Sequence, residues 1–100
     1  MIKVYHFPSE LIRYVPYFDP ARQAEFATLG FSKYHLVAEV DTDELKDAFM
    51  LTRSLYGHWS TNDRVEAHQT SRSTGICDVM EKDGKFFVVA NTGFNEISVE

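Results

Sequence analysis

Residues 34–57 read YHLVAEVDTDELKDAFMLTRSLYG and change from a strand pattern to a helix pattern near Asp41. The first seven of these residues are mostly apolar and rich in β-branched side chains, which predicts a well-covered strand. Asp41 and Glu44 then have the spacing of a capping box, in which side chains satisfy the free amides at a helix start. Apolar residues follow at helical intervals, and Gly57 favours an end there. We therefore expect a strand followed by a principal helix over residues 42–55.

Four further segments have strand patterns, and a short segment over residues 94–99 closes the chain. The four cover residues 2–7, 65–68, 76–82 and 85–90. The last two flank Asp83-Gly84, a pair that tolerates the two positive φ angles of a type I′ turn. These two segments are therefore expected to form a β-hairpin.

Residues 8–33 interrupt this pattern as an aromatic-rich insertion, called the insertion below. Its prolines exclude a long helix. Asp19 before Pro20 is typical of an N-cap followed by proline at the first helical position. A short helix over residues 21–29 is expected, with Gly30 as a left-handed C-cap.

Together these elements predict one α+β domain over residues 1–100. The economical arrangement is a mixed, mainly antiparallel sheet of about four to five strands with the principal helix packed on one face. For the other face the sequence leaves three alternatives. The insertion covers it, water covers it, or it serves as an interface.

Composition limits the classes of function. Ten basic and fifteen acidic side chains give a net charge of −5, which argues against broad binding to DNA or RNA. The single cysteine, Cys77, excludes an internal disulfide, and no CxxC pair indicates a zinc ribbon. The amino-terminal segment is too short and polar for a secretory signal, and no apolar run approaches a membrane span. A cytoplasmic protein without a membrane partner is expected.

Residues that carry reactive groups form no recognised motif. The histidines are His6, His35, His58 and His68. None belongs to an HxxxH or HxH pair, and although His6 and His35 lie in strands that could be neighbours, structural roles are expected. Cys77 lies beside Asp78, whose charge disfavours a reactive thiolate. We therefore expect no metal, no cofactor and no enzyme activity.

Two polar regions are candidate binding features. Acidic residues that include Asp43 and Asp47 surround a helix start and are expected to stabilise it, with a contact patch for a basic partner as the alternative. The loop over residues 72–75 carries hydroxyls and an arginine, but no helix follows it to complete a phosphate site. Instead, Arg72 is expected to pair with a carboxylate such as Asp78.

The aromatic side chains of the insertion are the third candidate feature. They lack the interleaved basic residues of a base-stacking surface, so core cover or a protein interface fits better. The candidate partner surface combines aromatic, basic and acidic residues. It consists of Tyr14, Tyr17, Phe18, Arg22, Arg72, Asp43 and Asp47.

Short motifs at characteristic spacing run from Tyr34 onward, over roughly two thirds of the chain. They are VAEVDTD at 37–43, AF at 48–49, LT at 51–52, Trp59, Asn62, Val65, RST at 72–74, DV at 78–79, DGK at 83–85, VA at 89–90 and GF at 93–94. This set resembles a family of small uncharacterised proteins of phages, plasmids and other mobile elements, and its C-terminal part is similar to YodL-like domains. The family has Ser-Val-Gly-Asp where this chain has GICD, so Cys77 replaces a glycine. The resemblance implies a mobile-element origin and no assigned reaction.

The leading hypothesis is a phage or mobile-element accessory protein that binds and modulates a host macromolecule in the host cytoplasm. A host protein is the expected partner, with inhibition of a defence or replication component as the expected effect. One alternative is a small nucleic-acid-binding domain that uses the edge from Arg64 to Arg72. Others are an enzyme site of His58 or His68 with Asp78 and Arg72, a structural or virion role, and a homodimer formed through an exposed aromatic sheet face.

Overall fold

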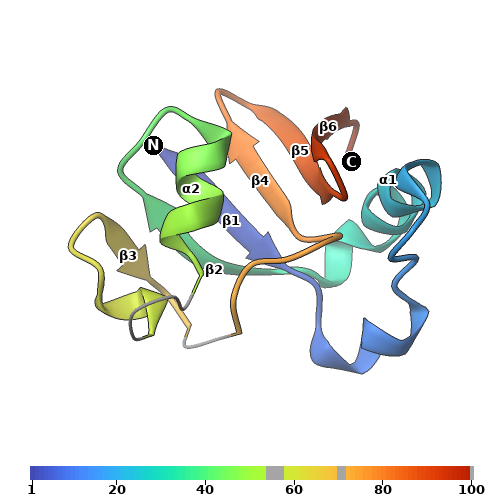
Figure 1. Cartoon of the computed structure of the whole chain (residues 1–100), viewed down its shortest axis with the longest axis horizontal. Coiled ribbons are helices and arrows are strands. Elements are labelled where there is room, and N and C mark those ends of the chain that lie inside the picture. Colours follow the sequence, from blue (N-terminus) through green and yellow to red (C-terminus); the bar gives the residue numbers. More distant parts are fainter. Residues whose placement is uncertain (54–57, 70–71, 100) are drawn as a thin grey trace.

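The computed structural model describes residues 1–53, 58–69 and 72–99. Its centre is a six-stranded sheet with the order β3-β2-β1-β4-β5-β6, in which each neighbouring pair is antiparallel (Figure 1). The strands are β1 (Ile2–His6), β2 (His35–Val40), β3 (Val65–Ala67), β4 (Val79–Lys82), β5 (Lys85–Ala90) and β6 (Gly93–Ile97). The predicted α+β class and antiparallel pairing are confirmed, but the sheet has more strands than expected.

The turns between the last three strands explain this difference. Asp83 and Gly84 have φ angles of 52° and 78°, as expected for the turn of the predicted β4–β5 hairpin. Ala90 is the partner of Gly93, so a two-residue loop also joins β5 to β6. The closing segment, expected to be only a short addition, therefore pairs along β5 as a sixth strand.

One layer of the molecule consists of α2 (Leu45–Leu51) and the side chains beneath it. The helix lies across β1 (Figure 1). It begins later than expected, with Glu44 as N-cap residue and no side-chain cap. The predicted capping box is wrong because the amide of Asp41 donates to the Arg64 carbonyl (2.8 Å) and is not available to the Glu44 side chain. It also ends earlier than the predicted residue 55, because Thr52 is already the C-cap after Leu51, and Gly57 lies outside the described residues.

The core under α2 comes mainly from alternate positions of the strands, with Val37 added next to Ala38 where the β1–β2 register shifts. It contains Ile2, Val4, Val37, Ala38, Val40, Ala48, Val65, Met80, Val89 and Trp59, the last from the 3-10 turn η3 (Trp59–Thr61). Successive residues such as Val88 and Val89 belong to different cores, because neighbouring side chains of a strand point to opposite faces. The sheet is therefore covered on both sides.

The insertion forms the layer on the opposite face. It consists of η1 (Ser9–Tyr14), α1 (Pro20–Gly30) and η2 (Phe31–Lys33), and α1 lies beside β5 and β6 (Figure 1). The core on this side contains Phe7, Val15, Ala27, Tyr34, Cys77, Val79, Val88 and Ile97. Of the three alternatives for this face, cover by the insertion is observed over β4, β5 and β6, whereas Glu66 at the β3 edge of the same face is exposed.

The ends of α1 agree only in part with the sequence prediction. Asp19 is the N-cap and accepts a hydrogen bond from the Arg22 amide (3.3 Å), and Pro20 is the first helical residue, as expected. Gly30 has φ −100° and ψ 0°, so the predicted left-handed C-cap is wrong. The chain instead continues into η2. Within the described ranges, no helix has the length and apolar content needed to cross a membrane.

Candidate functional site

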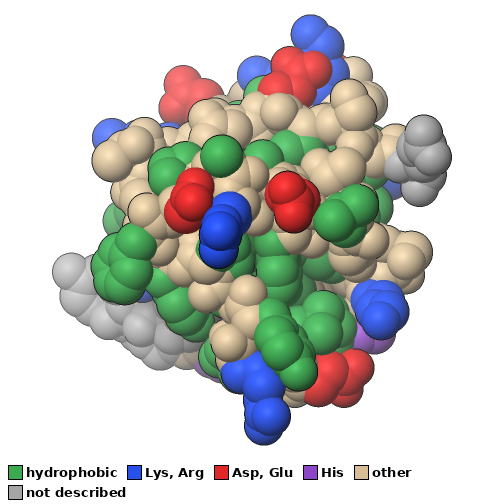
Figure 2. Space-filling model, turned by 90° about the vertical axis from the view of Figure 1, so that its right-hand side faces the viewer, with side chains coloured by type: hydrophobic (Ala, Val, Ile, Leu, Met, Phe, Trp, Pro, Cys, Tyr) green, Lys and Arg blue, Asp and Glu red, His purple; other side chains and the backbone are tan. Residues whose placement is uncertain are grey.

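An exposed apolar surface lies on the outer side of the insertion. Figure 2 shows this side of the molecule, where apolar side chains gather around a few charged ones. Among the described residues, seven large apolar side chains are exposed, and five of them belong to the insertion. These five, called the insertion surface below, are Ile12, Tyr14, Tyr17, Phe18 and Leu29. Single exposed apolar residues are common, whereas large contiguous apolar patches are typical of interaction sites.

A hollow of about 590 Å³ between η1 and α1 forms part of this surface. Tyr14 and Leu29 both line it, although they are distant in the sequence. Arg22 and Glu25 add one charge of each sign to a lining that is otherwise mainly apolar. The hollow can therefore accept an apolar group that has polar neighbours.

Hydrogen bonds fix the loop that presents Phe18. The buried Gln23 side chain donates through Nε2 to the Pro16 carbonyl (2.9 Å) and to Asn91 Oδ1 (2.6 Å). Asn91 in turn donates through Nδ2 to the carbonyl of Tyr17, next to Phe18. The loop is thus tied to the β5–β6 turn, and Phe18, which is 95% exposed, extends from a fixed backbone. A surface held in this way loses less conformational entropy on binding.

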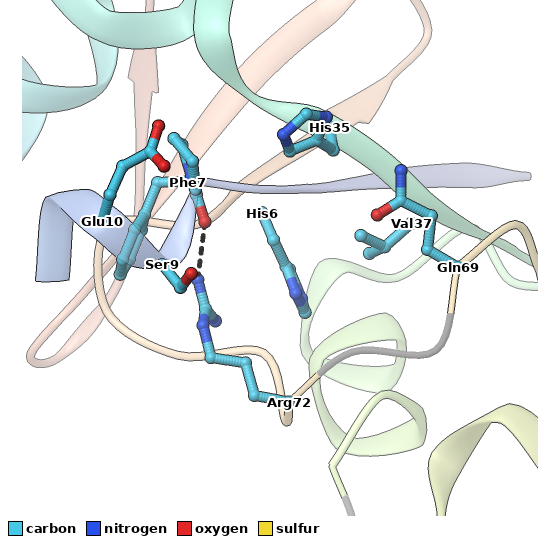
Figure 3. Close-up of a pocket in the computed structure, with 9 residues that line it drawn as sticks. His6, Phe7, Ser9, Glu10, His35, Val37, Gln69 and Arg72 are labelled. Atoms are coloured by element: carbon cyan, nitrogen blue, oxygen red, sulfur yellow. Dashed lines mark hydrogen bonds between the residues drawn. The ribbon is translucent and has the colours of Figure 1, made fainter.

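A second, polar hollow of about 400 Å³ lies where β1 ends (Figure 3). Its lining comes from residues 6–10, from His35 and Val37 of β2, and from Gln69 and Arg72. In Figure 3 the His6 side chain extends between Arg72 and Gln69. The character of this pocket therefore depends on how His6 and Arg72 are held.

Arg72 forms a bidentate ion pair with the fully buried Asp78. Its Nη1 and Nη2 donate to Asp78 Oδ2 and Oδ1 at 2.5 and 2.8 Å, and the amides of Gly75 and Phe7 donate to the same carboxylate. Burial raises the pKa of Asp78, and these hydrogen bonds oppose the rise. The guanidinium also lies 4.2 Å from the centre of the Phe7 ring. The predicted pairing of Arg72 with Asp78 is confirmed, and it fastens the 72–78 loop to the end of β1.

His6 is the buried titratable group beside this pair. Its Nε2 lies 2.9 Å from Thr74 Oγ1 and 3.8 Å from Asp78 Oδ2. Burial, and then the charge of Arg72, lower the pKa of His6 to about 3, so its imidazole is neutral at pH 7. His6 is the ladder partner of His35, as their predicted strands allowed, but His35 is exposed. Arg72, Asp78 and neutral His6 together carry no net charge.

Within the described residues, neither His58 nor His68 has a hydrogen bond or an ion pair with Asp78. His58 Nδ1 lies 2.7 Å from Ser60 Oγ, and His68 Nε2 lies 2.9 Å from Glu39 Oε2. The imidazole that meets Asp78 is instead that of His6. This contact was missed, although the alternation of β1 places His6 on the same buried face as Ile2 and Val4.

Cys77 is buried against the insertion and has the properties of a structural residue. Burial, and then the neighbouring Asp78 charge, raise the pKa of its thiol to about 12. Tyr34 donates its hydroxyl proton to the Cys77 carbonyl (2.6 Å). The φ of Cys77 is 73°, in the region that favours glycine. Glycine is the residue that the family resemblance places here.

The predicted partner surface divides among three places. Tyr14, Tyr17, Phe18 and Arg22 are exposed together on the insertion. Asp43 and Asp47 lie at α2, in the opposite layer, where Asp43 pairs with the terminal amine (3.2 Å) and Asp47 with Arg64 (2.9 Å). Arg72 lies in the polar pocket. Sequence reasoning also missed Leu29, although it lies off the face marked by the buried residues 23 and 27 of α1.

Both arginines of the alternative nucleic-acid edge have partners within the chain. Arg64 donates to the Asp41 carbonyl (2.8 Å) as well as to Asp47, and Arg72 is held by Asp78. Comparisons with family models, curated proteins and solved structures found no match for this chain. The relation to mobile-element proteins stays a prediction.

Proposed function

We propose that this chain is an accessory protein of a phage or mobile element that binds a host protein through the insertion surface. The observation that supports this proposal is the exposure of five large apolar side chains on one segment, with Phe18 95% and Leu29 77% exposed. Folding gains nothing from a phenylalanine in water, whereas burial of such a ring against a partner is strongly favourable. Interface centres favour aromatic residues and arginine, and Arg22 is exposed on the same segment.

The partner that fits is a folded protein with a protruding apolar group flanked by polar ones. That group enters the hollow between η1 and α1, while Arg22 and Glu25 pair with its neighbours. Because Gln23 and Asn91 already fix the Tyr17–Phe18 loop, the surface binds without large rearrangement. A small protein that covers a partner's surface in this way inhibits or modulates it by occupation.

A nucleic-acid partner receives less support from the same features. The net charge is −5, and the guanidinium groups of Arg64 and Arg72 are directed to acceptors within the chain. Phosphate binding depends on cations that are free to replace counterions. The protein partner is therefore the function that we propose.

The test compares the wild-type chain with a Tyr14→Ser/Phe18→Ser double variant and a Met50→Ser control. Met50 is an exposed apolar residue (45%) on α2, in the opposite layer. A partner captured from the host is identified by mass spectrometry, purified, and titrated against all three proteins. Since loss of an interface anchor costs about 2 kcal/mol or more, the double variant should bind at least about tenfold more weakly, with the control unchanged. Equal affinity of the double variant and wild type would refute the insertion surface as the binding site.

A further inference from the structure

Strands β2 and β3 bring three ligand-bearing side chains together at the edge of the sheet. Glu39 and Glu66 are direct partners in the ladder, and His68 follows two residues after Glu66. Val40 and Val65, the adjacent pair, belong to the core under α2, so both glutamates point to the opposite face. One ligand atom from each of the three side chains lies within 4.8 Å of the others. Glu66 and His68 are exposed, and Glu39 is half-buried.

The charges of this group are not balanced by the chain. Like charges directly opposite each other in a ladder are destabilising. Within the described ranges, neither Glu39 nor Glu66 forms an ion pair with a lysine or arginine. The contact that relieves Glu39 is with an imidazole, His68 Nε2, at 2.9 Å. Lys3 is the ladder partner of Glu39 on the β1 side, but it also faces Glu81, so one lysine serves two carboxylates there. Glu39 and Glu66 therefore share this corner of the sheet with a nitrogen ligand and without full charge compensation.

We propose that Glu39, Glu66 and His68 bind a first-row divalent transition-metal ion such as Zn²⁺. One imidazole nitrogen with two carboxylate oxygens suits such ions, whereas Mg²⁺ and Ca²⁺ prefer ligand sets made of oxygen alone. The expectation of no metal rested on the lack of His-Cys spacing motifs. The signal that it overlooked is Glu-x-His, which places both side chains on one face of a strand.

The spacing of the ligand atoms suits this proposal. Bonds of about 2.0–2.2 Å to a tetrahedral zinc ion place its ligands about 3.4 Å apart. The distance of 2.9 Å between His68 Nε2 and Glu39 Oε2 is already close to this value. The other distances among the three ligand atoms do not exceed 4.8 Å, and side-chain rotation can shorten them to about 3.4 Å. The ladder fixes the backbone, since the His68 amide donates to the Val37 carbonyl (2.8 Å). Water completes the coordination.

The ion would join the edge strand to the rest of the sheet. β3 has three residues and pairs with β2 alone in the described sheet. A metal bound across the two strands neutralises the opposed carboxylates and adds its binding free energy to the stability of the folded state. This site lies on β2 and β3, so it is independent of the insertion surface and of the proposed function.

The test uses tag-free protein treated with a chelator and titrated with Zn²⁺ by calorimetry. We expect one ion per chain and a higher melting temperature with zinc. Glu66→Gln and His68→Asn should weaken binding at least about tenfold, because even the loss of a group that only supports a ligand costs about 10–100-fold. The controls are Glu96→Gln and His35→Asn, which change exposed strand residues elsewhere and should bind as wild type does.

A spectroscopic measurement on the unaltered chain provides a second, independent readout. Zinc should shift the side-chain nitrogen resonances of His68 and leave those of His35 unchanged. No stoichiometric binding by wild type overturns the proposal. The proposal is also overturned if both ligand substitutions leave zinc binding unchanged. It is overturned as well if the two control substitutions weaken binding as much as the ligand substitutions do.

Discussion

His6 is a residue whose protonation the fold controls. In the unfolded chain an imidazole titrates near its ordinary value of 6.5, whereas burial and the Arg72 charge lower the pKa of the folded state to about 3. Between these values the unfolded chain binds the proton and the folded chain does not. The contribution of the His6 site to the free energy of unfolding is therefore fully present above pH 6.5. It is lost progressively as the pH drops from 6.5 toward 3.

This difference predicts an acid-sensitive step that belongs to one residue. Between about pH 7.5 and about pH 5.5, the wild-type chain should lose about 1.4 kcal/mol more unfolding free energy than a His6→Asn variant. Urea titrations at both pH values measure it, and effects of other groups that are common to the two proteins cancel in the comparison. An equal loss in both proteins would mean that His6 is protonated normally in the folded state.

At the scale of elements, local signals were reliable where no distant segment competes with them. The Asp83-Gly84 turn and the Asp19-Pro20 helix start depend on neighbouring residues, and both are confirmed. The predicted cap at Asp41 failed because its amide is used by Arg64, a long-range partner. A sequence pattern shows that a cap is available but does not show which acceptor the amide will find.

Gly30 offers a direct check on the end of α1. With φ −100° the position is open to other residues, and an added Cβ would lie 3.8 Å from Tyr34 Cε1, an ordinary contact. Gly30→Ala should therefore stabilise the chain by about 0.4–1 kcal/mol, because alanine has less freedom in the unfolded state. Gly84→Ala, at φ +78°, should instead destabilise it by about 1 kcal/mol or more. Denaturant unfolding measures both, and a destabilising Gly30→Ala would restore the left-handed cap that the sequence suggested.

For the whole molecule, the sequence located the binding candidates but not their division between core and surface. Tyr34, which directly follows the insertion, is buried, whereas Phe18 within the insertion is almost fully exposed. The difference depends on how α1 packs against β5 and β6, which are distant from it in the sequence. The same cause separates Asp43 and Asp47 from the aromatic residues, because α2 lies in the other layer.

The insertion is part of the folding unit as well as the proposed contact surface. Replacing residues 10–30 with a Gly/Ser linker of equal length removes Val15 and Ala27 from the second core and uncovers Val79 and Val88 on the sheet. A domain with a stability of about 5–15 kcal/mol does not tolerate the loss of one of two cores, so we expect the cooperative thermal transition to disappear and a hydrophobic dye to bind. Circular dichroism and dye fluorescence measure the two effects. The Tyr14→Ser/Phe18→Ser variant, which changes exposed residues alone, should melt as wild type does. A cooperative melt of the linker variant would mean that the sheet with α2 folds alone, and that the insertion is a separable appendage.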